Sequence, residues 1–177
     1  MNKNVLLTSM MLALALTACS EDKAVSVATA PEAVAEQPAA AALSTGNGPH
    51  VLADMDQLNG VMNTFTVEAE RLNEDLIAAR QTNNAGQLKA IMAQLKASTQ
   101  RMNDDLSHLG LQSQDVDDVR AKMIDANRRS MQLYDLAAQD EHTAEDKQKI
   151  TDLSQQVQAI QMSVGQALMG FEAAYVK

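Results

Sequence analysis

The stretch "VLADMDQLNGVMNTFTVEAERLNEDLIAA", residues 51–79, carries apolar side chains at alternating steps of four and three residues. Such spacing places these side chains on one face of an α-helix, because 3.6 residues make one turn. The stretch therefore predicts a long helix with one apolar seam, which consists of Val51, Met55, Leu58, Met62, Phe65, Ala69, Leu72, Leu76 and Ala79.

Three further segments repeat this pattern, and each begins with residues that favour a helix N-terminus. Asn84 is followed three residues later by Gln87, and Ser113 is followed by a cluster of aspartates. Thr143 precedes two acidic residues, which suit the first turn of a helix. Gly110 is expected as the glycine that follows the end of the second helix.

Four helical segments of similar length with short connections predict an all-α fold. Short connections force neighbouring helices to run antiparallel, so we expect an up-down-up-down four-helix bundle over residues 51–177. Heptad seams favour shallow crossing angles between the helices. The alternative is a pair of long helical hairpins that complete their core only as a homodimer.

The chain begins with the features of a secretory signal peptide. Lys3 supplies a positive charge, residues 5–16 are mostly apolar, and small residues follow. The apolar run is too short to span a bilayer, which takes about 20 residues. We therefore expect residues 1–18 to be removed.

Residues 16–19, Leu-Thr-Ala-Cys, resemble the lipobox of bacterial lipoproteins. The resemblance implies that Cys19 is the lipidation site and becomes the first residue of the mature chain. Two or more acyl chains, such as palmitate, hold a protein stably on a membrane. In Gram-negative lipoproteins an Asp after this cysteine often marks retention in the inner membrane, whereas the residue here is Ser20. We expect an outer-membrane lipoprotein, anchored by lipid at the periplasmic face.

Residues 19–50 have the composition of a flexible linker. They are rich in Ala, Glu, Ser and Gly, lack aromatic residues and contain all three prolines of the chain. A segment of this kind cannot bury enough apolar surface to offset the entropy lost on ordering. We expect a tether between the lipidated cysteine and the helical domain.

The charge balance limits the partners. The chain has 14 Lys and Arg against 23 Asp and Glu, a net charge of −9 that becomes −10 once Lys3 is removed. An acidic protein lacks the cationic clusters that bind nucleic acid or anionic lipid headgroups. We expect no nucleic-acid partner, and contact with the membrane through the lipid anchor. With one cysteine, no intramolecular disulfide can form.

Residues 72–98, "LNEDLIAARQTNNAGQLKAIMAQLKAS", resemble the first hairpin of the periplasmic b-type cytochromes that form four-helix bundles. The resemblance implies the same fold. In that family, haem lies between a methionine near the start of the first helix and a histidine near the end of the last. Ala69 stands at the methionine position, and residues 143–177 contain no histidine. We therefore expect no haem and no other cofactor.

No grouping of residues predicts a catalytic or metal site. Asp105 and His108 have the i, i+3 spacing of carboxylate–histidine sites in helical bundles, but such sites need two elements of this kind. Met162 and Met169 are seven residues apart, so we expect them in the core rather than as copper ligands.

Two features of the helical segments remain. Arg128 and Arg129 form a small basic patch in an acidic domain, which is either a solvated helix face or a contact for an acidic partner. Gly165 and Gly170 are expected to permit close packing of a neighbouring helix.

These observations favour a non-enzymatic, lipid-anchored protein that binds another protein or has an accessory role in the envelope. The alternative is a bundle that binds a small apolar molecule, haem or a metal in its core. The chain has no pairing of a nucleophile with a base that would indicate an enzyme.

Overall fold

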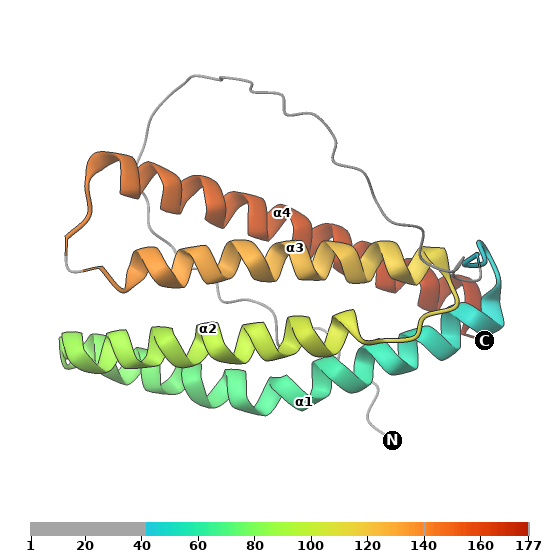
Figure 1. Cartoon of the computed structure of the whole chain (residues 1–177), viewed down its shortest axis with the longest axis horizontal. Coiled ribbons are helices and arrows are strands. Elements are labelled where there is room, and N and C mark those ends of the chain that lie inside the picture. Colours follow the sequence, from blue (N-terminus) through green and yellow to red (C-terminus); the bar gives the residue numbers. More distant parts are fainter. Residues whose placement is uncertain (1–41, 140, 177) are drawn as a thin grey trace, which may run out of the picture.

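The computed structural model describes residues 42–139 and 141–176, which form four α-helices (Figure 1). The helices are α1 (Gly48–Gln81), α2 (Ala85–Ser107), α3 (Gln114–Ala137) and α4 (Ala144–Tyr175). Successive helices run in opposite directions, so the predicted all-α, up-down-up-down arrangement is confirmed.

Side chains next to the helix ends satisfy the free backbone N–H groups there. Asn47 and Asn84 each accept a hydrogen bond from the backbone N–H three residues later. At the start of α4, the backbone N–H of Asp146 donates to Thr143 Oγ1, and the backbone N–H of Thr143 donates to Asp146 Oδ2. The side-chain and backbone hydrogen bonds from Thr143 hold the pKa of the Asp146 carboxyl below its usual value.

Two predicted boundaries need correction. α1 begins at Gly48, with Pro49 in its first turn, where the missing N–H of proline has no cost. The predicted linker therefore ends before residue 50. Its part before residue 42, which includes Cys19, lies outside the described residues, as does the predicted signal peptide. α2 ends at Ser107, so Gly110 stands beyond the helix end and does not take the left-handed conformation.

The core differs between the two ends of the bundle. At the near end, where α1 starts and α4 finishes, all four helices contribute to one cluster, made up of Leu58, Leu106, Val119, Met123 and Val164. A second cluster beside it contains Val51, Met55 and Val116, with Phe171 and Tyr175 packed against them.

At the far end, two separate clusters form. One joins α1 and α2 and consists of Leu72, Leu76, Ala79, Ile91, Met92 and Leu95. The other joins α3 and α4 and consists of Leu133, Leu136, Ile150, Leu153 and Val157. α3 also packs against the first cluster, through Tyr134 and its last residues. Toward this end α4 diverges from α1, and the two helices touch far less than successive helices do (Figure 1).

The prediction that Met162 and Met169 lie in the core is wrong, because they are 60% and 49% exposed. Their spacing of seven residues does place them on one face of α4. The buried residues of α4, among them Leu153, Val157 and Val164, occupy the opposite face.

Candidate functional site

The segment before α1 is hydrogen-bonded to the connection between α2 and α3. The backbone N–H of Ser44 donates to the carbonyl of Gln112 at 2.8 Å, and the carbonyl of Ser44 accepts from the N–H of Gln114 at 2.8 Å. The N–H of Gly46 donates to Asp115 Oδ2 at 2.7 Å. The chain therefore enters the domain at a fixed point of the near end.

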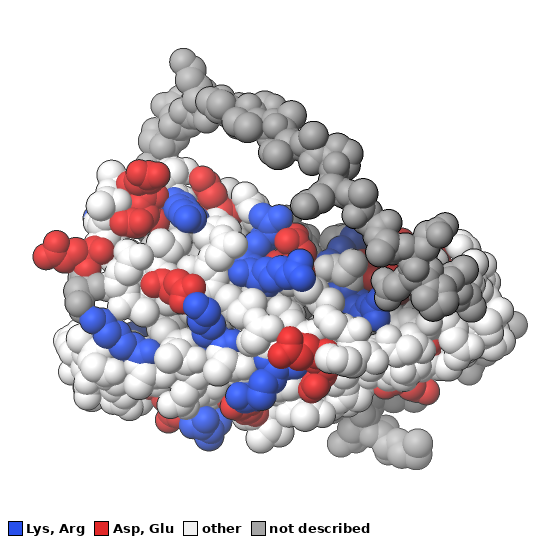
Figure 2. Space-filling model, in the orientation of Figure 1, with Lys and Arg blue, Asp and Glu red and all other residues white. Residues whose placement is uncertain are grey.

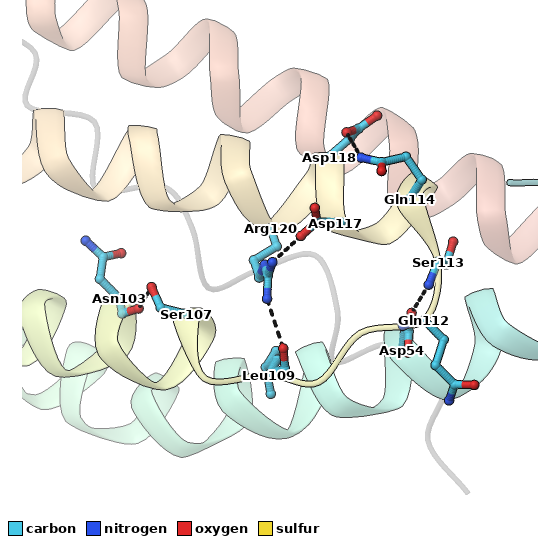
Figure 3. A network of polar contacts seen from close by, with 10 residues as sticks. All are labelled: Asp54, Asn103, Ser107, Leu109, Gln112, Ser113, Gln114, Asp117, Asp118 and Arg120. Atoms are coloured by element: carbon cyan, nitrogen blue, oxygen red, sulfur yellow. Dashed lines mark hydrogen bonds and ion pairs between the residues drawn. The ribbon is translucent and has the colours of Figure 1, made fainter. Parts of the chain in front are cut away.

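A buried carboxylate of α1 holds the same connection from the other side. Asp54 is fully buried, and its Oδ2 accepts hydrogen bonds from the backbone N–H groups of Gln112 and Ser113 at 2.7 and 2.6 Å (Figure 3). Ser113 is the N-cap residue of α3, but its own side chain makes no capping bond. Asp54 thus supplies the negative charge that favours a helix N-terminus. We term the contacts of Ser44, Gly46 and Asp54 with residues 112–115 the tether junction.

Arg120 fastens the beginning of the same connection. Its Nη1 donates to the carbonyl of Leu109 at 2.9 Å, and its other terminal nitrogen pairs with Asp117 (Figure 3). The connection between α2 and α3 is therefore bonded to the segment before α1, to α1 itself and to α3.

A hydroxyl and an imidazole also meet at the tether junction. Ser44 Oγ lies 2.8 Å from Nδ1 of His50 and 3.1 Å from the carbonyl of Gln112. A Ser–His nucleophile usually has a third group that orients the histidine, and no carboxylate in the described part of the chain bonds to His50. The pair therefore attaches the entering segment to the first turn of α1.

The other two histidines bond to backbone carbonyls. His108 is the C-cap residue of α2, and its Nδ1 lies 2.6 Å from the carbonyl of Asp104. His142 Nε2 lies 2.9 Å from the carbonyl of Leu136. Over residues 42–139 and 141–176, no three His, Cys, Asp or Glu side chains gather as ligands for a metal ion.

The predicted basic patch lies on α3, and its two arginines differ. Arg129 pairs with Asp125 at 3.0 Å and donates to Gln156 of α4. Arg128 is exposed and has no ion pair or hydrogen bond with another described residue. Lys and Arg lie among Asp and Glu on the face of the molecule that Figure 2 shows, so this surface is of mixed charge.

Midway along the bundle, a polar cluster joins α1 to α2. Glu68 Oε2 accepts from Ser98 Oγ at 2.7 Å and from Arg101 Nη2 at 2.8 Å. The hydrogen bond from Ser98, followed by that from Arg101, holds the pKa of the Glu68 carboxyl below its usual value.

The outward face of α4 carries no charge in the later part of the helix. Between Leu153 and Phe171 the sequence has no Asp, Glu, Lys or Arg. The residues on the side of this part of α4 opposite its core are exposed, and so is Val176, which follows the helix end. We term these residues the uncharged α4 face: Gln155, Gln158, Ala159, Met162, Gln166, Met169, Ala173 and Val176.

Gly165 and Gly170 flank the uncharged α4 face. A Cβ added at either position would meet no atom within 4 Å, so the prediction that they permit close packing inside the bundle is wrong. Glycine within a helix is about 0.5–1 kcal/mol less stable than alanine. No contact within the described residues offsets that cost.

Asp54 and Ser44 were not predicted as functional residues from the sequence. The signal for Asp54 was its place on the apolar seam, three residues after Val51 and four before Leu58, where a charged residue needs a partner. Ser44 lies in a stretch whose composition is the same as that of a linker, so no local pattern indicated its role.

Comparison with known proteins agrees with the lipoprotein prediction. None of the described helices has the length and apolar character needed to cross a bilayer. No curated protein and no solved structure matches the chain, and the resemblance to b-type cytochromes is unconfirmed. The model of the family described as "uncharacterised lipoprotein PM1805" matches residues 52–176, which includes nearly all of the four helices. Because this match covers more than half of the chain, the protein belongs to that family of lipoproteins.

Proposed function

We propose that the protein is anchored to the outer membrane through Cys19, with its helical domain at the periplasmic face, and that it binds another protein without catalysing a reaction. The observation that carries the anchor is the position of Cys19, the only cysteine, at the end of a lipobox in a member of a lipoprotein family. Ser20 after the cysteine favours the outer membrane.

The tether junction supports a role that depends on how far the helical domain extends from the membrane and on where the chain enters the domain. Twenty-four residues separate Cys19 from Ser44, and a flexible chain of that length spans about 25–30 Å on average. At its end, Ser44 and Gly46 are bonded to the connection between α2 and α3. The domain would therefore explore a layer next to the membrane while its own shape stays fixed.

The outward face of α3 is the proposed contact for an acidic protein. Arg128 is exposed and unpaired among the described residues, so it can form a charge-assisted hydrogen bond with a partner without first losing one. Arg129 already bonds to Asp125 and to Gln156 of α4, so we assign it a role in positioning these helices rather than in direct contact with the partner. The Ser44–His50 pair fastens the tether junction, and we assign it no catalytic role.

Fractionation and crosslinking of the full-length protein in a Gram-negative host test this proposal. We expect the wild type in the outer-membrane fraction, Cys19→Ala in the soluble fraction, and Ser20→Asp in the inner-membrane fraction. Crosslinking in cells followed by pull-down should recover a protein partner with the wild type, and about tenfold less of it with Arg128→Glu. Equal membrane retention of Cys19→Ala would overturn the anchor, and equal partner recovery by Arg128→Glu would overturn the assigned contact.

A further inference from the structure

The uncharged α4 face has large apolar side chains that the described residues leave exposed. Met162, Met169 and Val176 are 60%, 49% and 58% exposed. The helical part of the face extends over residues 155–173, about 27 Å at 1.5 Å per residue, and Val176 follows the helix end. Apolar side chains grouped on one exposed face indicate an interaction site, whereas single ones do not.

The absence of charge restricts what can cover this face. The other helices expose charged residues, such as Glu70 on α1, Lys96 on α2 and Arg128 on α3. A charged partner surface would lose hydration against the uncharged α4 face without gaining an ion pair. The surface that covers it must therefore be uncharged over a similar length. The α4 helix of a second copy has this property, because it is the same surface.

The order of large and small residues along α4 also fits a second copy. If two α4 helices lie antiparallel about a two-fold axis between Gly165 and Gln166, Met162 faces the second copy's Met169. Gln166 then faces the second copy's Gly165, and Gln158 faces the second copy's Ala173. In both polar pairs a long side chain meets a small one, which lets the helix backbones approach closely.

The antiparallel arrangement also separates the nearest charges. Glu172 is the charged residue of α4 that lies within the length of the face, and it would lie near the second copy's Ala159 rather than its Glu172. A two-fold axis repeats every contact, so each pairing occurs twice. Gly165 and Gly170, which have open space beside them in one chain, would then border the second helix.

We propose that the uncharged α4 face binds a second copy of this chain, with the two α4 helices antiparallel about an axis between Gly165 and Gln166. This inference goes beyond the proposed function, because pairing through α4 leaves Arg128 on α3 available to another protein.

Thiol crosslinking of the full-length protein in membranes tests the pairing. Gln166→Cys places a thiol near the proposed axis, and Gln132→Cys places one on the outward face of α3. Both positions hold an exposed glutamine in the wild type, so they form a matched pair. A short bis-maleimide should convert Gln166→Cys into a species of twice the chain mass, at least about tenfold more efficiently than Gln132→Cys or the wild type.

Charges introduced on the face test the antiparallel geometry. In the Gln166→Cys chain, Met169→Glu should lower crosslinking by about tenfold, because it sets a charge against the second copy's Met162. Adding Met162→Lys to Met169→Glu should restore crosslinking, because opposite charges then face each other, whereas parallel helices would bring like charges together. Both methionines are exposed, so circular dichroism should show an unchanged fold.

The outcomes that overturn the pairing are distinct from failure of the anchor. The proposal fails if Gln166→Cys crosslinks no more than Gln132→Cys, crosslinks only to a different protein, or is not restored by the charge pair. Membrane fractionation of the same variants reports on the anchor independently of all three results.

Discussion

The near and far ends of the bundle differ in how many helices share a core. At the near end, Leu58 lies in a cluster with residues of α2, α3 and α4. At the far end, Leu72 lies in a cluster formed mainly by α1 and α2, while α3 and α4 form a cluster of their own. Neither cluster at the far end draws its buried residues from more than two helices, whereas the cluster around Leu58 at the near end draws them from all four.

The two ends also differ in their connections. The segment before α1, the connection between α2 and α3, and the end of α4 meet at the near end, where the tether junction lies. Regions with fewer shared buried contacts open at lower free energy. Local opening should therefore begin at the far end, and a force applied through the lipid anchor would act on the more cohesive end.

Matched leucine substitutions in α1 should change the free energy of unfolding most, and they test directly whether the near end is more cohesive than the far end. Leu58 and Leu72 are both fully buried, and both belong to α1. Leu58→Ala should lower the free energy of unfolding by about 4–5 kcal/mol, because four helices fix the cavity walls, and Leu72→Ala by about 3 kcal/mol. Urea denaturation followed by circular dichroism measures both values.

An exposed residue of the same helix serves as the control. Ile77 is 48% exposed, and Ile77→Ala should change the free energy of unfolding by less than about 0.5 kcal/mol. Equal losses for Leu58→Ala and Leu72→Ala would show that the two ends are equally cohesive, contrary to the comparison.

Removal of the Asp54 carboxylate should destabilise the near end of the bundle. Asp54→Ala leaves the buried N–H of Ser113 and the part-buried N–H of Gln112 without this acceptor, and hydrogen bonds to a charged group each contribute about 1.5–3 kcal/mol. We expect a loss of about 3 kcal/mol, and about 1 kcal/mol for Asp54→Asn, whose amide oxygen still accepts. Hydrogen exchange at Gln112 and Ser113 should accelerate in both variants.

Asp56 offers a matched control for this substitution. It is an exposed aspartate of α1, two residues from Asp54, so Asp56→Ala should have an effect within about 0.5 kcal/mol of zero. Unchanged exchange at Gln112 and Ser113 in Asp54→Ala would show that the connection does not depend on the carboxylate.

The four helices could be predicted because their apolar spacing is local and repeats over many turns. The sequence did not show, however, which of the two apolar faces of α4 is buried. Two apolar stripes run along this helix, one through Val157 and Val164 and the other through Met162 and Met169, and both have the same spacing. Charged residues usually show which stripe faces water, and the sequence between Leu153 and Phe171 has none.

The tether junction could not be predicted because its contacts join distant parts of the sequence. Asp54 binds the backbone of residues that lie 58 and 59 positions later, and Ser44 binds Gln112, 68 positions later. Gly, Pro, Ser and Asn are typical both of linkers and of helix caps. Composition alone therefore assigned residues 44–50 to the linker, although they begin the folded domain.

The smallest expected effect concerns Glu68, which lies between the two ends and joins α1 to α2 through Ser98 and Arg101. The pKa of Glu68 is lowered in the folded protein. The hydrogen bond from Ser98 therefore stabilises the fold above the unfolded-state pKa of about 4.3, and this stabilisation is lost as the pH falls through the lower folded pKa.

The Glu68 side chain is 33% exposed, so Ser98→Ala should cost less than about 1 kcal/mol at pH 7. Urea denaturation from pH 7 to 3 should show this cost unchanged down to about pH 5 and decreasing steadily as the pH falls further toward 3. In a Glu68→Gln background the effect of Ser98→Ala should not vary with pH. A cost that grows on acidification would contradict the assignment, because it would require a group whose pKa is raised rather than lowered by folding.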